Sequence, residues 1–171
     1  MANVWRMAVV LTAVAACQRT APVPETTPVV AAKPVLDVAP AAKPHIDLVN
    51  APGDGPIAPY VVAEQTRAKA DGRRVLVYVG ATWCEPCRRF HDAAAAGQLD
   101  DEFANLRLLE FDLDRDRDRL AADGYRSDLI PLIALPGPDG KGNGRGMQGS
   151  IKGDGAVPQM RPRLRDLLAQ P

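Results

Sequence analysis

The chain has 171 residues, and its 21 basic and 21 acidic side chains leave no net charge. A balanced charge argues against a nucleic-acid-binding protein that relies on a basic surface. The hydrophobic content of 46% is ordinary for a globular protein, and no apolar run reaches the roughly 20 residues that a membrane-spanning helix needs. Three cysteines are too few for a disulfide-rich scaffold, so their positions matter more than their number.

The N-terminal residues predict an export signal. Residues 1–6 carry one basic side chain, and residues 7–16 are apolar or small apart from one threonine. The segment Val14-Ala15-Ala16-Cys17 resembles the lipobox of bacterial lipoproteins, in which the cysteine is acylated and becomes the first residue of the mature protein. We therefore expect a signal peptide over residues 1–16 and a lipid anchor on Cys17. An ordinary signal peptide with a coincidental cysteine is the alternative.

Residues 17–59 predict a flexible linker between the lipid and a packed domain. Nine of the 16 prolines lie in this stretch, and X-Pro steps disfavour helix. A proline-rich ligand for a partner domain is the alternative, but the stretch has no dense P-x-x-P array. Gln18 resembles the outer-membrane sorting pattern of lipoproteins, which implies an outer-membrane position facing the periplasm if the cell is Gram-negative.

Residues 60–171 predict an α/β domain. We expect a helix over 60–70, a buried strand over 75–79, helices over 88–96 and 98–105, a strand over 106–113, a helical turn within 114–124, strands over 132–135 and 146–151, and a helix over 160–169. Glycines between residues 140 and 146 predict a mobile hairpin loop. The order of elements predicts a mixed central sheet of about four strands flanked by helices on both faces.

The candidate site is the segment Cys84-Glu85-Pro86-Cys87, which follows the buried strand and opens a helix. Thiols three residues apart lie on the same side of a helix, where they can form a disulfide. Pro86 suits the first helical turn. The helix N-terminus favours the thiolate of Cys84, so we assign Cys84 as the nucleophile and Cys87 as the resolving thiol.

The segment Trp83-Cys84-Glu85-Pro86-Cys87, together with Leu129-Ile130-Pro131 before a later strand, resembles the thioredoxin superfamily over residues 60–171. The resemblance implies a thioredoxin fold and a redox disulfide, with no cofactor. It also implies that Pro131 is cis, that the backbone of Ile130 binds substrate, and that Trp83 belongs to the apolar rim around Cys84. Within the superfamily, the chain resembles membrane-attached thioredoxin-like reductases.

Two residues depart from the thioredoxin pattern. Tyr78 stands where thioredoxins usually carry a buried aspartate that assists proton transfer from the resolving thiol, so this transfer must use Glu85, water or another group. Glu85 places a negative charge beside Cys84, which should raise the pKa of its thiol. A less stabilised thiolate favours the reductant direction, with a potential nearer the roughly −270 mV of thioredoxin than the roughly −120 mV of a strong oxidase.

Other candidate sites are set aside on their ligand patterns. Cys84, Cys87 and His91 lack the second ligand pair of a structural zinc site, and Arg88 stands where a c-type haem site needs histidine. Alternating aspartates between residues 112 and 118 lack the glycine and the bidentate glutamate of a calcium loop, so we expect a solvated connection there.

Together these features predict an exported, lipid-anchored thiol-disulfide oxidoreductase that reduces disulfides in exported proteins. Cytosolic cofactors do not reach that compartment, so a transmembrane thiol reductase is the expected electron donor. A disulfide oxidase or isomerase is one alternative. The other is a non-catalytic lipoprotein binding module of thioredoxin fold, in which the disulfide is structural.

Overall fold

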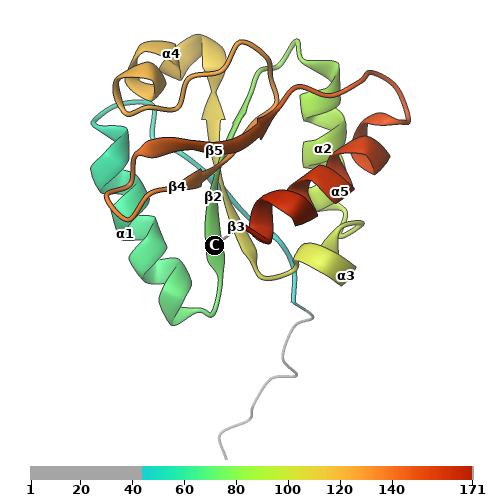
Figure 1. The fold of residues 1–171 in the computed structure, drawn as a ribbon, viewed down its shortest axis with the longest axis horizontal. Coiled ribbons are helices and arrows are strands. Elements are labelled where there is room, and N and C mark those ends of the chain that lie inside the picture. Colours follow the sequence, from blue (N-terminus) through green and yellow to red (C-terminus); the bar gives the residue numbers. More distant parts are fainter. Residues whose placement is uncertain (1–43, 171) are drawn as a thin grey trace, which may run out of the picture. The chain divides into compact units, whose positions relative to one another are not determined.

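A computed structural model describes residues 44–170, in which strands and helices alternate along the chain (Figure 1). The elements are β1 (Asp47–Asn50), α1 (Ile57–Ala70), β2 (Arg74–Gly80), α2 (Glu85–Ala95), α3 (Asp100–Phe103), β3 (Leu106–Asp112), α4 (Leu113–Ala122), β4 (Leu132–Pro136), β5 (Gly142–Gln148) and α5 (Ala156–Leu168). The predicted signal peptide and Cys17 lie outside the described residues.

The strands form one mixed sheet in the order β1-β3-β2-β4-β5. β1, β3 and β2 are parallel, whereas β4 pairs antiparallel with both β2 and β5. β2 is therefore the central strand, and Val75 to Gly80 are all buried, as its continuous apolar run predicts. The Cys84 segment follows at the carboxyl end of this strand.

The sheet has one strand more than the sequence predicts, because β1 lies within the expected linker. Asp47 to Asn50 pair in parallel with β3, and Ile46 and Ala51 on either side are buried. The expected domain boundary at residue 60 was therefore too late in the chain. Prolines on both sides give this short strand a linker-like composition, yet an edge strand needs hydrogen bonds on one side only.

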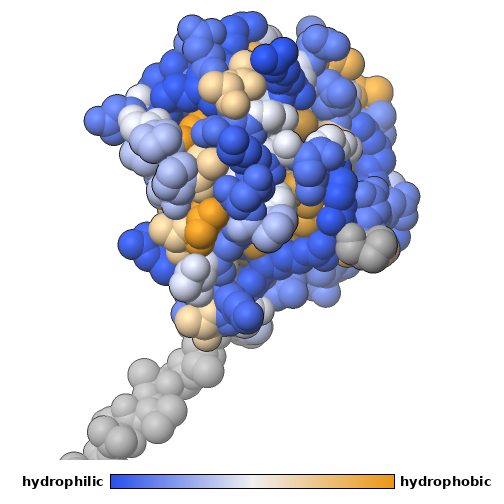
Figure 2. Space-filling model, turned by 60° about the vertical axis from the view of Figure 1, so that its left-hand side comes forward, coloured by the Kyte–Doolittle hydropathy of each residue, from blue (hydrophilic) through white to orange (hydrophobic). Residues whose placement is uncertain are grey.

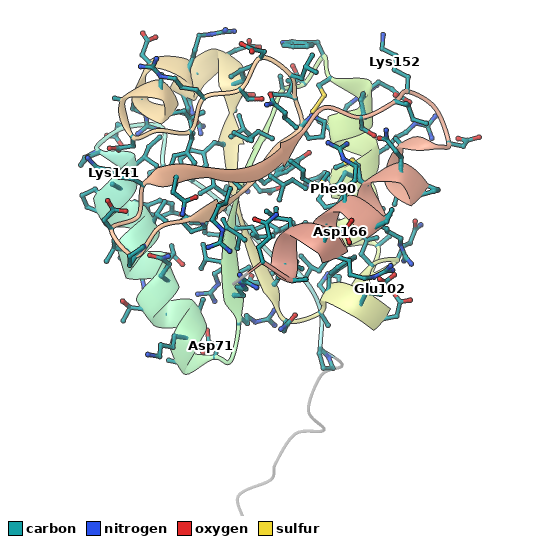
Figure 3. All side chains as sticks on the ribbon, viewed as in Figure 1. Asp71, Phe90, Glu102, Lys141, Lys152 and Asp166 are labelled. Atoms are coloured by element: carbon teal, nitrogen blue, oxygen red, sulfur yellow. A yellow bond between two sulfur atoms is a disulfide. The ribbon has the colours of Figure 1, made fainter. Side chains whose placement is uncertain are left out.

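Helices cover both faces of the sheet, as predicted (Figure 1). On one face, side chains of α2, α3 and α5 pack against the sheet, among them Phe90, Phe103 and Met160. On the other face, α1 and α4 contribute Ile57, Val61 and Leu120. Phe90 points from α2 into the interior (Figure 3), which fixes the helix that carries the two cysteines.

The glycine-rich stretch is a strand and not the predicted mobile loop. From Gly142 onward it forms β5, the edge strand beside β4. A Cβ on Gly146 would lie 2.9 Å from the backbone oxygen of Ile133, and one on Gly142 would clash with the backbone of Gly124. These glycines therefore allow neighbouring backbones to approach closely. A glycine-rich composition alone does not distinguish such a strand from a mobile loop.

Four helices are longer than the sequence predicts, and two of them, α1 and α2, begin at Ile57 and Glu85, each three residues before the expected start. α4 is a ten-residue helix where only a helical turn was expected. α5 starts at Ala156, four residues before the predicted start at Met160, and Pro158 lies in its first turn, where a missing N–H breaks no helical bond. Among the residues that the structure describes, no helix combines the length and apolarity that crossing a membrane requires.

Candidate functional site

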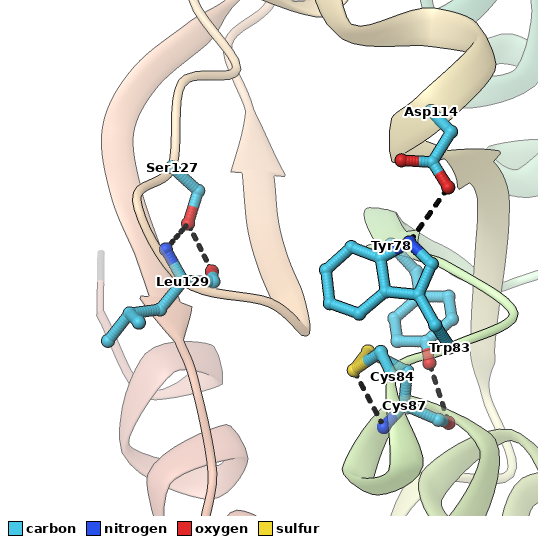
Figure 4. The surroundings of a disulfide bond; sticks show 7 residues. All are labelled: Tyr78, Trp83, Cys84, Cys87, Asp114, Ser127 and Leu129. Atoms are coloured by element: carbon cyan, nitrogen blue, oxygen red, sulfur yellow. Dashed lines mark hydrogen bonds between the residues drawn. A yellow bond between two sulfur atoms is a disulfide. The ribbon is translucent and has the colours of Figure 1, made fainter.

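The two cysteines of the candidate site form a disulfide at the N-terminus of α2. The S–S distance is 1.98 Å, and Cys84 is the N-cap residue of the helix. The backbone N–H of Cys87 donates to Sγ of Cys84 at 3.3 Å (Figure 4). Pro86 lies in the first turn, as predicted. In the reduced protein this N–H and the helix N-terminus both favour the thiolate of Cys84.

Trp83 forms one side of the surface next to Cys84. Its side chain is 63% exposed, and the indole N–H donates to Oδ2 of Asp114 at 2.8 Å (Figure 4). Asp114 lies in the first turn of α4, so this helix orients the ring. The role of Trp83 in an apolar rim that contacts substrate stays a prediction.

The loop before β4 lies opposite Trp83. The Ile130–Pro131 peptide bond is cis, as the resemblance implied, and the carbonyl of Pro131 accepts from the N–H of Gly149 at 2.9 Å. Leu129 is 61% exposed, and the Ser127 hydroxyl bonds to its backbone (Figure 4). Sequence reasoning did not assign a role to Leu129, although its apolar side chain directly precedes the Ile-Pro pair.

A surface groove of about 520 Å³ brings these segments together. Its lining includes Trp83 and Cys84 on one side and Leu129 and Ile130 on the other, with Arg117 and Lys152 among the remaining residues. Pro131 is buried beneath the loop. The groove is suited to an extended peptide segment, because apolar side chains and backbone groups flank the sulfur of Cys84.

Large apolar side chains are otherwise rare on the surface. Figure 2 shows a face on which hydrophilic residues predominate and hydrophobic ones form only small patches. Among the described residues, the exposed large hydrophobic side chains are Val62, Trp83, Leu129 and Ile151. Trp83 and Leu129 line the groove, so half of this exposed apolar set lies beside Cys84.

Glu85 is ionised but its charge is partly compensated. The carboxylate pairs with Arg89 one turn along α2 and accepts from the Gly153 N–H at 3.2 Å. The hydrogen bond from Arg89 lowers the pKa of Glu85, against an opposing effect of burial, and the Gly153 N–H adds to the lowering. Arg89 also pairs with Asp154 at 2.8 Å. The expected negative charge beside Cys84 is present, with a guanidinium attached to it.

Tyr78 takes a structural position beneath the disulfide. Its hydroxyl donates to the carbonyl oxygen of Cys87 at 2.8 Å, and its ring packs on Phe90 with centroids 5.6 Å apart. Burial raises the pKa of Tyr78 well above its usual range, and the charges of Glu110 and Asp92 act in the same direction. The phenol therefore stays neutral and fixes the first turn of α2 without taking a proton.

The structure also brings Glu110 close to this site, which the sequence reasoning did not single out. In the parallel pairing of β2 and β3, Glu110 stands opposite Tyr78. The side chain of Glu110 is 12% exposed, and its Oε1 lies 3.5 Å from Nε2 of His91 on α2. The one signal in the sequence was a carboxylate between the two buried apolar residues Leu109 and Phe111.

Several solved thioredoxins are similar to the chain. A poplar thioredoxin h is 17% identical, with a TM-score of 0.46 over 73% of this chain and 99% of its own. A mutant thioredoxin from Halobacterium salinarum is 16% identical, with a TM-score of 0.45 over 78% of this chain and 99% of its own. Thioredoxin from Trichomonas vaginalis is 20% identical, with a TM-score of 0.42 over 74% and 97%. No protein-family model and no curated protein matches the chain.

The chain has a thioredoxin fold, which its own topology shows. A central strand leads into the Cys84-Cys87 helix, and a cis proline precedes the antiparallel strand β4 that pairs with this central strand. The predicted fold class is thus confirmed, with five strands in place of about four. Such a site can exchange a dithiol for a disulfide, because Cys84, although only 5% exposed, lies at a helix N-terminus and lines a surface groove.

Proposed function

We propose that this protein is a thiol-disulfide oxidoreductase that works as a reductase. The observation that carries the proposal is the Cys84–Cys87 disulfide at the N-terminus of α2, beside the groove between Trp83 and Ile130. A purely structural disulfide needs neither a groove with exposed apolar side chains beside one sulfur nor a helix N-terminus that favours its thiolate.

The reaction follows from the placement of the two sulfurs. The Cys84 thiolate attacks a substrate disulfide, forming a mixed disulfide and releasing one substrate thiolate. Cys87 then loses its proton and attacks Sγ of Cys84, which releases the second substrate thiolate and closes the Cys84–Cys87 disulfide. Two electrons pass to the substrate, whose two thiolates take up protons. Trp83, Leu129 and Ile130 hold the substrate chain beside Cys84 during both steps.

Reduction of insulin tests the activity. With dithiothreitol as electron donor, wild-type protein should accelerate the precipitation of insulin chains, and Cys84→Ser should fall to the uncatalysed rate because it lacks the nucleophile. Cys17→Ala is the matched control, since it removes a cysteine outside the site and should keep full activity. Equal, negligible rates in wild type and Cys84→Ser would support the non-catalytic binding module.

The direction of electron flow has its own measurement. The charge of Glu85 disfavours the Cys84 thiolate, so we expect a potential near the roughly −270 mV of thioredoxin in a glutathione redox titration. A value above about −150 mV would instead support an oxidase or isomerase.

We further propose that the protein is exported and anchored through lipid on Cys17, with reduced substrates in the periplasm of a Gram-negative cell and a transmembrane thiol reductase as donor. The lipobox-like segment ending at Cys17 supports this location. Cys17→Ala should release the protein from membranes on fractionation, and unchanged retention would contradict the anchor. Substrates can be identified as mixed disulfides that accumulate on Cys87→Ala, which cannot resolve them.

A further inference from the structure

A second surface pocket lies beside Cys87, and its lining is separate from that of the substrate groove. It has a volume of about 400 Å³, and its lining includes Cys87, Tyr78 and Gly80 together with His91 and Glu110. The substrate groove is lined by Cys84 and not by Cys87, so the two sulfurs have separate surroundings. The resolving cysteine therefore faces a polar pocket large enough for several water molecules.

The reaction requires a proton acceptor in this pocket. Cys87 is buried, and it must lose its proton before it attacks the mixed disulfide on Cys84. Tyr78 is neutral and already donates its hydroxyl hydrogen to the Cys87 carbonyl. Glu85 lines the substrate groove and is bound to Arg89 and Gly153, so it lies on the other side of the site.

Glu110 is the carboxylate that this pocket offers. It stands on β3 opposite Tyr78, and its side chain is mostly buried while still lining the pocket. Gly80, the residue at the end of β2, keeps the space beside Cys87 narrow but unfilled: an added Cβ would lie 3.3 Å from Cβ of Cys87 and 3.4 Å from the Tyr78 hydroxyl. Any side chain there would separate Cys87 from the pocket.

We propose that Glu110 is the proton acceptor for Cys87, acting through water in this pocket, and that His91 tunes it; this inference rests on the proposed oxidoreductase function. In the resolving step the Cys87 thiol gives its proton to the Glu110 carboxylate, and the thiolate attacks Sγ of Cys84. The S–S bond to the substrate breaks, and the leaving thiolate takes a proton from solvent. Glu110 then returns its proton to solvent through the open pocket.

The electrostatics of the pocket fit this role. Burial raises the pKa of Glu110 above its ordinary value, and the neighbouring His91 lowers it in part. A carboxylate with a raised pKa is a stronger base than an exposed one. The charged and titratable groups that line the pocket with Glu110 are Tyr78 from β2, Arg88, His91 and Asp92 from α2, Asp112 at the end of β3 and Arg115 from α4.

A two-phase experiment separates the two thiols. The full-length protein and all its variants carry Cys17→Ala here, so that the third thiol contributes no signal. When this reduced protein reacts with dithiobis-nitrobenzoate in a stopped-flow instrument, Cys84 releases the first aromatic thiolate and Cys87 releases the second. Glu110→Gln should slow the second phase at neutral pH by about tenfold or more and leave the first phase unchanged. The first phase thus reports in the same trace that the variant is folded. Asp118→Asn, which removes an exposed carboxylate of α4, is the matched control and should behave as wild type.

The pH profile distinguishes a proton acceptor from a structural residue. In wild type the rate of the second phase should decrease at low pH as Glu110 becomes protonated. His91→Gln should move this decrease to higher pH, because it removes the group that lowers the Glu110 pKa. In Glu110→Gln this decrease at low pH should disappear, leaving a rate that rises only with the ionisation of the Cys87 thiol. Glu110→Asp should restore part of the rate.

Equal second-phase rates and pH profiles in wild type and Glu110→Gln would overturn the assignment of Glu110. This outcome is separate from failure of the proposed function, which would appear as absence of insulin reduction by the wild-type protein. If the wild-type protein does not reduce insulin but still shows a second phase that depends on Glu110, then Glu110 is the proton acceptor of Cys87. The proposed reductase function would then be wrong.

Discussion

At the scale of single residues, Glu85 and Arg89 together set the charge beside Cys84. The carboxylate alone would raise the pKa of the Cys84 thiol, but the guanidinium bound to it acts in the opposite direction. Both charges act on the thiol across a partly solvated surface. Water and salt screen them there, so the effect of each charge on the Cys84 pKa is small. The reductant character predicted from Glu85 therefore depends on the balance of the pair.

Single substitutions measure this balance. Glu85→Gln should lower the pKa of Cys84 by less than about one unit, and Arg89→Met should raise it by a similar amount, because each removes one of two opposing charges. The ultraviolet absorbance of the thiolate, followed against pH in the reduced protein, gives both values. A higher Cys84 pKa in Glu85→Gln would contradict the electrostatic account.

The residues that spacing alone predicted are those whose roles are local, whereas Ile130 and Pro131 were predicted through the family resemblance. Cys84, Cys87 and Pro86 lie within one turn of helix, so spacing alone indicated their arrangement. Glu110 could not be found in this way, because its proximity to the site depends on the register between β2 and β3. The bond between Glu85 and Gly153 likewise joins residues 68 positions apart, and nothing in either neighbourhood indicates it.

At the scale of elements, the aspartates at the start of α4 hold a helix and an active-site ring in place. Asp112 is the N-cap and accepts from the N–H of Asp114 at 2.8 Å, while Asp114 binds the Trp83 indole. Asp116 is fully buried and pairs with Arg115 and Arg119 at 2.8 and 2.7 Å. The solvated connection expected from these alternating charges was therefore wrong, because the arginines fold back to compensate the buried carboxylate.

Because Asp116 is buried and Asp118 is exposed, we expect only the substitution of Asp116 to destabilise the protein strongly. Asp116→Ala should lower the free energy of unfolding by about 2–4 kcal/mol, since it leaves two guanidinium groups without their shared partner. Urea denaturation measures the change, and Asp118→Ala on the exposed side of the same helix should stay within about 0.5 kcal/mol of wild type. Similar losses in both variants would show that helix charge in general, rather than the buried ion pairs, stabilises α4.

The same carboxylate gives a pH dependence whose sign follows from its pKa. Burial alone would raise the pKa of Asp116, but the hydrogen bonds from Arg115 and Arg119 outweigh it and lower the pKa below the ordinary 3.8. Its contribution is therefore complete above about pH 4 and is lost as the pH falls through the lower folded-state value. In Asp116→Ala the decline in stability below pH 4 should be shallower than in wild type.

In the whole molecule, ion pairs and hydrogen bonds connect elements that are distant in the sequence. They join α3 to α5, and α4 to the residues before α1. Glu102 of α3, labelled in Figure 3, pairs with Arg161 and Arg165 of α5. Arg119 of α4 donates to the carbonyls of Pro52 and Gly55, which fastens the segment between β1 and α1. The proline-rich composition of this segment hid its place in the fold, since its contacts lie more than 60 residues away.

The start of the folded domain can be tested by truncation. A chain of residues 44–171 should unfold cooperatively and keep both phases of thiolate release. A chain of residues 60–171 loses the buried side chains of Ile46 and Ile57 and leaves the edge of β3 unpaired. It also loses the bonds from the N–H groups of Ile57 and Ala58 to Asp123, which anchor the start of α1. Each buried isoleucine contributes about 2–4 kcal/mol, so their combined loss approaches the total stability of a small domain.

We therefore expect the shorter chain to show no cooperative thermal transition by circular dichroism, whereas the longer one unfolds in a single step. Hydrogen exchange on the longer chain should find the amides of β3 protected, because β1 and β2 cover its two edges. If residues 60–171 melted at the same temperature as residues 44–171, then β1 would be dispensable and the domain would begin where composition alone predicted. Because β3 carries Glu110, loss of β1 should also slow the second phase of thiolate release more than the first in any shorter chain that still folds.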